Sequence, residues 1–344
     1  MAKTNPGRFF EDYSIGQVIA HAVPRTLSGG ERALYHALYP ARHALYSSDE
    51  FARACGLPAA PLDDLIAFHT VFGKTVPDIS LNAVANLGYA EGRWHLPVYP
   101  GDTLRSDSEV IGLKQNSNGK SGVVWVRTRG VNQRGELVVE YVRWVMVRKR
   151  NMDLPAPEAT IPELAGAVAA QDLVLPEGLD FSDYDFSLAG EPHRWSDYEV
   201  GEIVDHVDGV TVEEAEHMQA TRLWQNTAKV HFDATFREDG RRLIYGGHVI
   251  SVARALSFNG LANAQMIVGL NGGAHANPCF AGDTVRAWTE ILDKAETAAP
   301  GVGALRLRLV ACKAGGIPGM LRGEDGKYLP HVLLDLDYWV LIPR

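Results

Sequence analysis

The chain contains 344 residues, of which 46% are hydrophobic and 22% are charged, so it is long enough for two domains that each bury a core. Its net charge of −9 argues against general nucleic-acid binding, which needs a basic face, although a local cluster of Arg and Lys could still bind a polyanionic small molecule. Three widely spaced cysteines disfavour a disulfide framework or a zinc site and fit a reducing compartment.

The N-terminal residues contain no apolar leader, and no apolar run reaches the ~18 residues that a membrane span requires. We therefore expect a soluble, cytoplasmic protein that does not associate with a membrane. The sequence also lacks a Gly-rich phosphate loop, paired metal-ligand spacing and a Gly-x-Ser-x-Gly elbow. We expect neither a metal nor a nucleotide redox cofactor.

Two similar series of elements are predicted along the chain. The first series has helices at residues 31–45, 49–55 and 61–71, followed by strands at 123–129 and 136–147. The second has helices at residues 212–228 and 249–261, followed by strands at 305–309 and 332–340. In both, a buried helix precedes an antiparallel sheet that curls around it, which is an α+β design.

Three sequence blocks occur twice in the same order, which indicates an internal duplication. The paired blocks are residues 10–16 with 195–201, residues 98–105 with 279–286, and residues 141–147 with 336–342. The middle pair shares Gly-Asp-Thr at Asp102 and Asp283, which we interpret as a bend that opens a strand. Chance could produce one such match, but not readily all three.

A stretch rich in Pro, Ala and acidic residues separates the two copies and is typical of a linker that wraps a surface. We therefore divide the chain into an N-terminal repeat at residues 1–150, a linker at 151–191 and a C-terminal repeat at 192–344.

This order of elements, with Gly-Asp-Thr opening a long strand, resembles the hotdog fold of the MaoC-like hydratases, and the duplicated length resembles their double-hotdog members. Each repeat would then be a long central helix wrapped by a curved antiparallel sheet. In detail the chain resembles the mesaconyl-CoA hydratases, also called β-methylmalyl-CoA dehydratases, at residues 225–233, 245–251 and 254–260. The resemblance implies a hydro-lyase that reversibly hydrates an enoyl-CoA thioester, with mesaconyl-CoA and β-methylmalyl-CoA as the expected pair.

The hydratase motif of this family is Asp-x-Asn-Pro-x-His, usually followed by x-Asp. When His231 is aligned with the motif histidine, Asp233 matches the trailing Asp, but Asn226 stands where the motif has its first Asp. In the first copy Tyr46 lies opposite His231 and the motif is lost, as expected if that copy supports the fold and shapes the pocket.

Hydration of an unsaturated thioester needs a base for water, donors for the developing enolate oxygen and an acid for Cα. We expect His231 to be the principal acid/base, because histidine titrates near neutral pH. Asn226 would fix the water or a substrate carboxylate, and Asp233 is a weaker candidate for a second acid/base. The turn Gly246-Gly247-His248 precedes the apolar helix, and the N–H groups of Gly247 and His248 would form an oxyanion hole.

The acyl carboxylate and the CoA phosphates should meet basic side chains. Arg222, Lys229 and Arg254 lie within or beside the motif segments and are the candidates for this contact. His275 is a further histidine that could face the pocket.

Two other functions remain open from the sequence. A hotdog thioesterase would need a carboxylate to activate water, which Asp63 or Asp64 could supply. A non-catalytic acyl-CoA-binding protein is the second alternative, since the motif Asp is absent. Hotdog folds pair their sheets edge to edge, and the fused pair already provides this contact, so a homo-oligomer is allowed but not required.

Overall fold

The computed structural model describes residues 3–344. The first half contributes the strands β1 (Val18–Thr26), β2 (Ala83–Trp94), β3 (Thr103–Gln115), β4 (Ser121–Val131) and β5 (Leu137–Arg148). The second half contributes β6 (Ile203–Thr211), β7 (Ile267–His275), β8 (Thr284–Glu296), β9 (Val302–Lys313) and β10 (Val332–Pro343).

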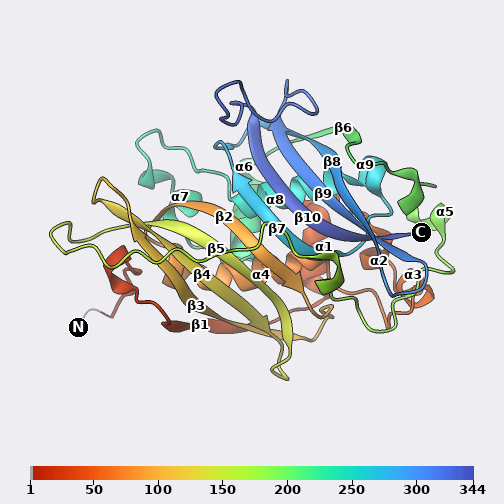
Figure 1. The fold of residues 1–344 in the computed structure, drawn as a ribbon, viewed down its shortest axis with the longest axis horizontal. Coiled ribbons are helices and arrows are strands. Elements are labelled where there is room, and N and C mark those ends of the chain that lie inside the picture. Colours follow the sequence, from red (N-terminus) through yellow and green to blue (C-terminus); the bar gives the residue numbers. More distant parts are fainter. Residues whose placement is uncertain (1–2) are drawn as a thin grey trace.

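In the described part of the chain these ten strands form one antiparallel sheet in the order β1-β3-β4-β5-β2-β7-β10-β9-β8-β6 (Figure 1). The order is the same from either edge once each strand is matched with its counterpart in the other half. The two halves meet at the centre, where Gly92 and Arg93 of β2 pair with Leu270 and Gly269 of β7. This symmetry is the physical form of the duplication seen in the sequence.

Helices cover one side of the sheet. The first half has α1 (Gly29–Leu38), α2 (Ala44–Ser47), α3 (Asp49–Ala54) and α4 (Asp64–Thr75). The second half has α6 (Glu214–Leu223), α7 (Lys229–Phe232), α8 (Gly246–Leu256) and α9 (Phe258–Leu261). The buried helices α4 and α8 lie behind the sheet in Figure 1, and each packs against strands of its own half. The chain therefore has the predicted α+β double-hotdog fold.

The repeated sequence blocks form the same local structures in both halves. Asp102 accepts a hydrogen bond from the Tyr99 N–H at 2.9 Å, and Asp283 accepts one from the Phe280 N–H at 2.9 Å. Each aspartate closes a bend directly before β3 or β8, as predicted for the two Gly-Asp-Thr blocks. These carboxylates therefore stabilise turns.

The segment 151–191 contains the short helix α5 (Phe186–Ala189) and packs against the second half of the sheet. Val168 accepts a hydrogen bond from the Trp339 indole at 2.9 Å, and Phe181 and Tyr184 belong to the same apolar cluster as Trp339.

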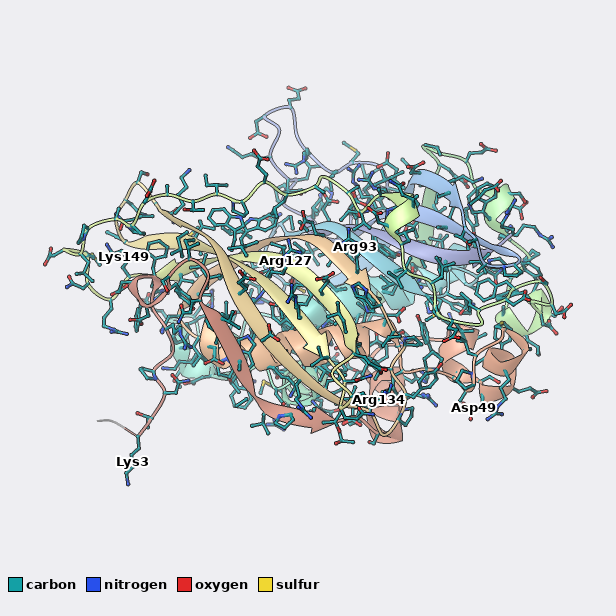
Figure 2. All side chains as sticks on the ribbon, turned by 60° about the horizontal axis from the view of Figure 1, so that its bottom comes forward. Lys3, Asp49, Arg93, Arg127, Arg134 and Lys149 are labelled. Atoms are coloured by element: carbon teal, nitrogen blue, oxygen red, sulfur yellow. The ribbon has the colours of Figure 1, made fainter. Side chains whose placement is uncertain are left out.

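On the outer face of the first half, Arg127 pairs with Glu91 at 2.7 Å, and Figure 2 shows Arg127 and Arg93 on that face.

The central helices begin at different places from those predicted. The helix expected at 61–71 begins at Asp64, because Asp63 caps it by accepting a hydrogen bond from the Leu65 N–H at 2.9 Å. The helix expected from Val249 begins three residues earlier, at Gly246. None of the helices within residues 3–344 combines the length and apolar character needed to cross a bilayer.

Candidate active site

A cavity of about 300 Å³ lies between the two halves of the molecule. Its first-half wall comes from the end of α4, the π-helix η2 (Val76–Ser80) and parts of β2 and β5. Its second-half wall comes from α7, the start of α8 and the end of β7 with the loop that follows. Gly73 of α4 allows the two halves to approach each other closely, since a Cβ at this residue would lie 1.7 Å from the Trp224 carbonyl oxygen of the second half.

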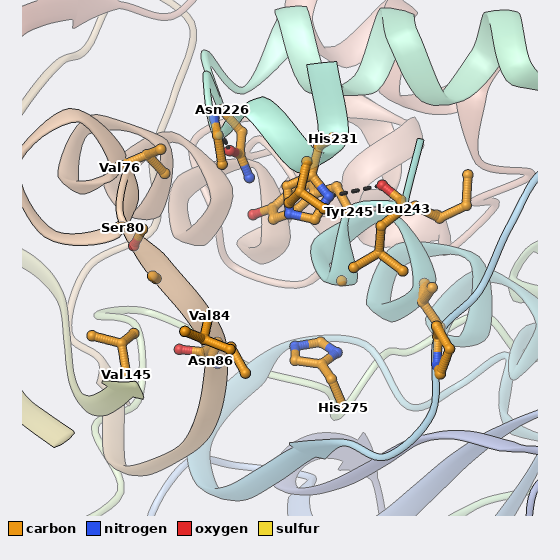
Figure 3. A pocket seen from close by; sticks show the side chains of 18 of the residues that line it. Val76, Ser80, Val84, Asn86, Val145, Asn226, His231, Leu243, Tyr245 and His275 are labelled. Carbon is orange, nitrogen blue, oxygen red and sulfur yellow. Dashed lines mark hydrogen bonds between the residues drawn. The ribbon is translucent and has the colours of Figure 1, made fainter. Parts of the chain in front are cut away.

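His231 of α7 borders the cavity. Its Nδ1 lies 2.8 Å from the Leu243 carbonyl oxygen, the contact drawn as a dashed line in Figure 3. Because a carbonyl oxygen can only accept, Nδ1 carries the proton and Nε2 carries the lone pair. Burial lowers the pKa of His231, although the hydrogen bond to Leu243 opposes this shift. Nε2 has no hydrogen-bond partner within residues 3–344, so a neutral imidazole offers a free basic nitrogen at the cavity.

Asn226 lies on the same wall and is only 2% exposed. Its Oδ1 accepts a hydrogen bond from the Ala228 N–H at 3.1 Å and so shapes the turn into α7. No acceptor for its Nδ2 is present among the described residues, which leaves an amide N–H for a water or a substrate oxygen.

The start of α8 provides free backbone donors, but not the predicted pair. The N–H of His248 donates to the Tyr245 carbonyl oxygen at 2.9 Å, and the buried His248 ring contacts Tyr39. The N–H groups of Gly246 and Gly247 have no acceptor in the described chain, and Gly246 borders the cavity. The available donors therefore lie one residue earlier than expected, because the helix starts earlier.

Of three further residues predicted for the site, two do not border the cavity and one does. Asp233 is exposed, and its Oδ1 accepts hydrogen bonds from the N–H and the hydroxyl of Thr235 at 2.9 and 2.7 Å. Arg222 is exposed in the last turn of α6. Lys229 is also exposed and borders the cavity. Of these three, only Lys229 is placed to meet a bound ligand.

Arg254 is buried within α8 and does not border the cavity. Its Nη1 donates to the Ser257 hydroxyl at 3.0 Å, and its Nη2 donates to the Gln265 carbonyl at 3.1 Å and to the Ala264 carbonyl. The structure therefore corrects its predicted substrate contact: these carbonyls occupy the guanidinium, which ties α8 to the segment before β7.

His275, at the end of β7, lies across the cavity from His231 (Figure 3). Its Nε2 is 3.2 Å from the Tyr89 hydroxyl, and burial lowers its pKa to about 4. A Cβ on Gly246 would lie 2.4 Å from the His275 ring, so this close approach requires glycine at residue 246. In the described residues, no group of three or more His, Cys, Asp or Glu side chains is arranged to hold a metal ion.

Comparison with known proteins decides the family. The family model described as "Mesaconyl-CoA hydratase" matches residues 1–319. The chain belongs to this family. It is 81% identical over 342 residues to a protein named mesaconyl-CoA hydratase from Cereibacter sphaeroides, covering 99% of this chain and 100% of that one. It is also 58% identical over 350 residues to a Chloroflexus aurantiacus protein named beta-methylmalyl-CoA dehydratase, covering 100% and 99%.

A solved structure has the same architecture. The crystal structure of a putative MaoC domain protein dehydratase from Chloroflexus aurantiacus superimposes with a TM-score of 0.98 and 57% identity, covering 100% of this chain and 99% of the other. The MaoC-like resemblance read from the sequence is thereby confirmed.

In this mesaconyl-CoA hydratase family member the cavity also has polar groups that the motif search missed. Arg143 and Asn86 border it from β5 and β2 of the first half. One sequence signal could have revealed the arginine. In the repeated block 141–147, Arg143 occupies the position held by Tyr338 in the second copy, on the alternating positions that face the core.

Proposed function

We propose that this chain catalyses the reversible addition of water to mesaconyl-CoA, which gives β-methylmalyl-CoA. The observation that carries the proposal is the free Nε2 of His231 at a cavity, in a chain 81% identical to a protein named mesaconyl-CoA hydratase. As a hydro-lyase it would form a C–O and a C–H bond across the double bond. Acid–base chemistry supplies every step, so the proposal includes no metal or redox cofactor.

The first step is attack of water on Cβ. Asn226 Nδ2 donates to the water and orients it toward His231, whose Nε2 takes the proton as the C–O bond forms. A neutral imidazole is needed here, and the lowered pKa of His231 keeps the ring neutral around physiological pH. An amide is sufficient beside this histidine, because its task is to position water and not to move a proton.

The second need is stabilisation of the enolate that forms as the electrons of the double bond move to the thioester. The free N–H groups of Gly246 and Gly247, at the positive end of α8, are the proposed donors to the thioester oxygen. The imidazolium formed in the first step then returns its proton from Nε2 to Cα. This restores the neutral histidine and leaves H and OH added across the former double bond.

The thioesterase alternative lacks an activating carboxylate among the described residues that line the cavity. Asp63 caps α4, and Asp64 accepts hydrogen bonds from the Ile267 N–H at 2.7 Å and from the Tyr46 hydroxyl. Neither borders the cavity, and burial raises the pKa of Asp64 to about 8, which disfavours its basic form.

We also propose a cytoplasmic setting with an acyl-CoA as the small-molecule partner. The three cysteines are free and buried, which suits a reducing compartment. A homo-oligomer would have the outer strands β1 and β6 available as sheet edges.

The proposal is tested with purified protein and mesaconyl-CoA. We expect loss of the conjugated-thioester absorbance without release of thiol, and mass spectrometry should identify β-methylmalyl-CoA. His231→Gln should lower turnover by ~10²-fold or more, because it removes the base. The matched control is His193→Gln, at an exposed histidine outside the cavity, which should leave turnover unchanged. Thiol release would instead indicate a thioesterase, and near-normal turnover in His231→Gln would remove His231 from the mechanism.

A further inference from the structure

Arg143 is a fully buried arginine on the cavity wall, with 0% of its surface exposed. Its Nη2 donates to the Thr75 hydroxyl at 2.7 Å and to the Ser80 hydroxyl at 3.0 Å. Its Nε and Nη1 are buried and have no hydrogen-bond partner among residues 3–344. These hydroxyls fix the guanidinium in place while part of its donor capacity stays unused.

The charge of Arg143 is also uncompensated. No carboxylate within residues 3–344 lies at ion-pair distance from it, and the closest aromatic partner is the Phe72 ring, 4.3 Å from Cζ. The ionisable side chains with the largest electrostatic effect on it are tyrosines, among them Tyr141 and Tyr89. A buried cation without an anion is costly, so this site is poised to receive one.

Other arginines of the same molecule show what a satisfied site looks like. On the outer face of the first half, Arg127 pairs with Glu91 at 2.7 Å (Figure 2). In the second half, the buried Arg254 donates to carbonyl oxygens and a hydroxyl. Arg143 differs from both, because it combines burial, a place on the cavity wall and free donors.

Asn86 adds a second group to the same place. It pairs with Val145 across β2 and β5, and Val145 and Arg143 are two residues apart on one face of β5. Both polar atoms of the Asn86 side chain are buried and find no hydrogen-bond partner in the described part of the chain, and Figure 3 shows Asn86 beside Val145 at the cavity. Its amide N–H could donate to the anion that Arg143 attracts.

We propose that Arg143, assisted by Asn86, binds the free carboxylate of the acyl group and selects dicarboxylic monothioesters over simple enoyl thioesters. This inference rests on the proposed function. In mesaconyl-CoA the free carboxylate is attached to Cβ, the carbon that water attacks, so it must lie deep in the cavity that His231 also borders. Its negative charge opposes attack by an oxygen nucleophile, and a nearby guanidinium offsets that charge.

The test uses two pairs of thioesters that differ only by this carboxylate. Tiglyl-CoA has a methyl group where mesaconyl-CoA has its carboxylate, and α-methylbutyryl-CoA is related in the same way to methylsuccinyl-CoA. The first pair reports turnover. The second pair is saturated and reports binding by calorimetry, even in variants that do not turn over.

In the wild-type protein we expect mesaconyl-CoA to be strongly preferred over tiglyl-CoA. Arg143→Gln should weaken methylsuccinyl-CoA binding by ~30-fold or more, while α-methylbutyryl-CoA binding changes by less than ~3-fold. Arg143→Lys retains the positive charge and should show a smaller loss, again confined to the carboxylated ligand. Arg129→Gln removes the same charge from an exposed position on β4 and should change neither affinity.

Each outcome separates the two proposals. Equal weakening of both saturated ligands in Arg143→Gln and Arg143→Lys, with native circular dichroism, would assign Arg143 to packing alone and overturn the inference. A wild-type protein that hydrates tiglyl-CoA as well as mesaconyl-CoA would also overturn it. If the wild-type protein hydrates neither substrate but still binds methylsuccinyl-CoA through Arg143, the proposed reaction fails while the carboxylate site stands.

Discussion

At the scale of single residues, His231 shows how a backbone carbonyl selects the chemistry of a side chain. The Leu243 carbonyl fixes the proton on Nδ1, so the lone pair stays on Nε2 of a residue that borders the cavity, without help from a carboxylate. The His217 and Tyr245 rings lie near, with centroids 6.4 and 5.8 Å from that of His231, and bring no negative charge. The absence of the motif Asp beside this histidine is therefore compatible with a base that is neutral at rest.

This arrangement predicts the pH dependence of hydration. Burial places the pKa of His231 below its ordinary value of 6.5, and the base acts only when neutral. We expect kcat/KM for mesaconyl-CoA to be level from about pH 8 to below pH 6.5 and then to fall by ~10-fold per pH unit. The profile is measured with free enzyme at low substrate, and the acidic limb should be absent from the residual activity of His231→Gln. A limb centred at or above pH 6.5 would contradict the proposed state of this histidine.

Sequence reasoning located some of these residues and missed others for a physical reason. His231 and Asn226 lie in one contiguous motif, so aligning that motif selected both residues. In the structure both border the same cavity. Arg143 and Asn86 are far apart in sequence and lie on strands of the copy that lost the motif. Only strand pairing brings them together, and a single arginine in a β-rich run is usually a solvated side chain.

At the scale of elements, the start of α8 depends on a close contact with β7. Gly246 is the first residue of α8, and a Cβ there would lie 2.4 Å from the His275 ring. The Nε2 of this ring also lies 3.2 Å from the Tyr89 hydroxyl. The helix start and the ring would therefore have to separate if residue 246 gained a side chain.

We therefore expect Gly246→Ala to lower stability by about 1–3 kcal/mol and to reduce kcat/KM by ~10-fold or more, because the free N–H groups would move. The matched control is Gly29→Ala at the first residue of α1, where a Cβ would meet nothing within 4 Å. That variant should be neutral or slightly stabilising. Urea denaturation and steady-state kinetics of both variants check the prediction, and equal behaviour of the two would refute it.

The helix boundaries show where pattern reasoning ends. Glycine is a poor residue inside a helix, so the pair Gly246-Gly247 was expected to be a turn before the helix. At the first positions of a helix this penalty matters less, and the Tyr245 N–H donates to His217 Nε2 at 2.9 Å, which anchors the entry. This long-range contact could not be read from the local sequence.

At the scale of the whole molecule, the three repeated blocks predict the duplication and the lost motif predicts that the first copy shapes the pocket, but the sequence does not show which first-half elements form the wall. The first-half elements that form this wall are α4, η2, β2 and β5. The reason is geometric: β2 and β7 pair at the centre of the sheet and bring the two central helices side by side. The copy that lacks the motif therefore forms one wall of the cavity.

Burial shifts the pKa values of many titratable groups in this protein. Burial lowers the pKa of nine histidines: His21, His36, His43, His69, His206, His217, His231, His248 and His275. The pKa falls to about 3 for His69 and to about 4 for His206 and His248. Two buried carboxyls shift the other way, since the pKa of Asp63 rises to about 6 and that of Asp64 to about 8.

These shifts predict that the folded state loses stability in mild acid. As pH falls through 6.5, the histidines of the unfolded chain bind protons, whereas the buried imidazoles of the folded protein stay neutral. Each such ring therefore lowers the free energy of unfolding by up to about 1.4 kcal/mol per pH unit. Asp63, Asp64 and Glu191, whose pKa burial also raises, bind protons more readily in the folded state and oppose the loss, but they are three groups against nine. Between about pH 7.5 and about pH 5.5 we expect the free energy of unfolding to fall by a few kcal/mol.

Urea denaturation at the two pH values measures this change, and a pair of variants tests its origin. His206 is buried and does not border the cavity; its Nε2 lies 2.8 Å from the Thr289 hydroxyl and its Nδ1 lies 2.8 Å from the Asn259 carbonyl oxygen. His206→Gln should be less stable than the wild-type protein at both pH values. Its free energy of unfolding should fall by about 1 kcal/mol less between them, because the variant has one fewer buried imidazole that binds a proton only after unfolding. His193→Gln, at an exposed position, should leave the loss unchanged. If the wild-type protein is equally stable at both pH values, the imidazoles are not held neutral by the core, and the lowered pKa on which His231 depends as a base would lose its support.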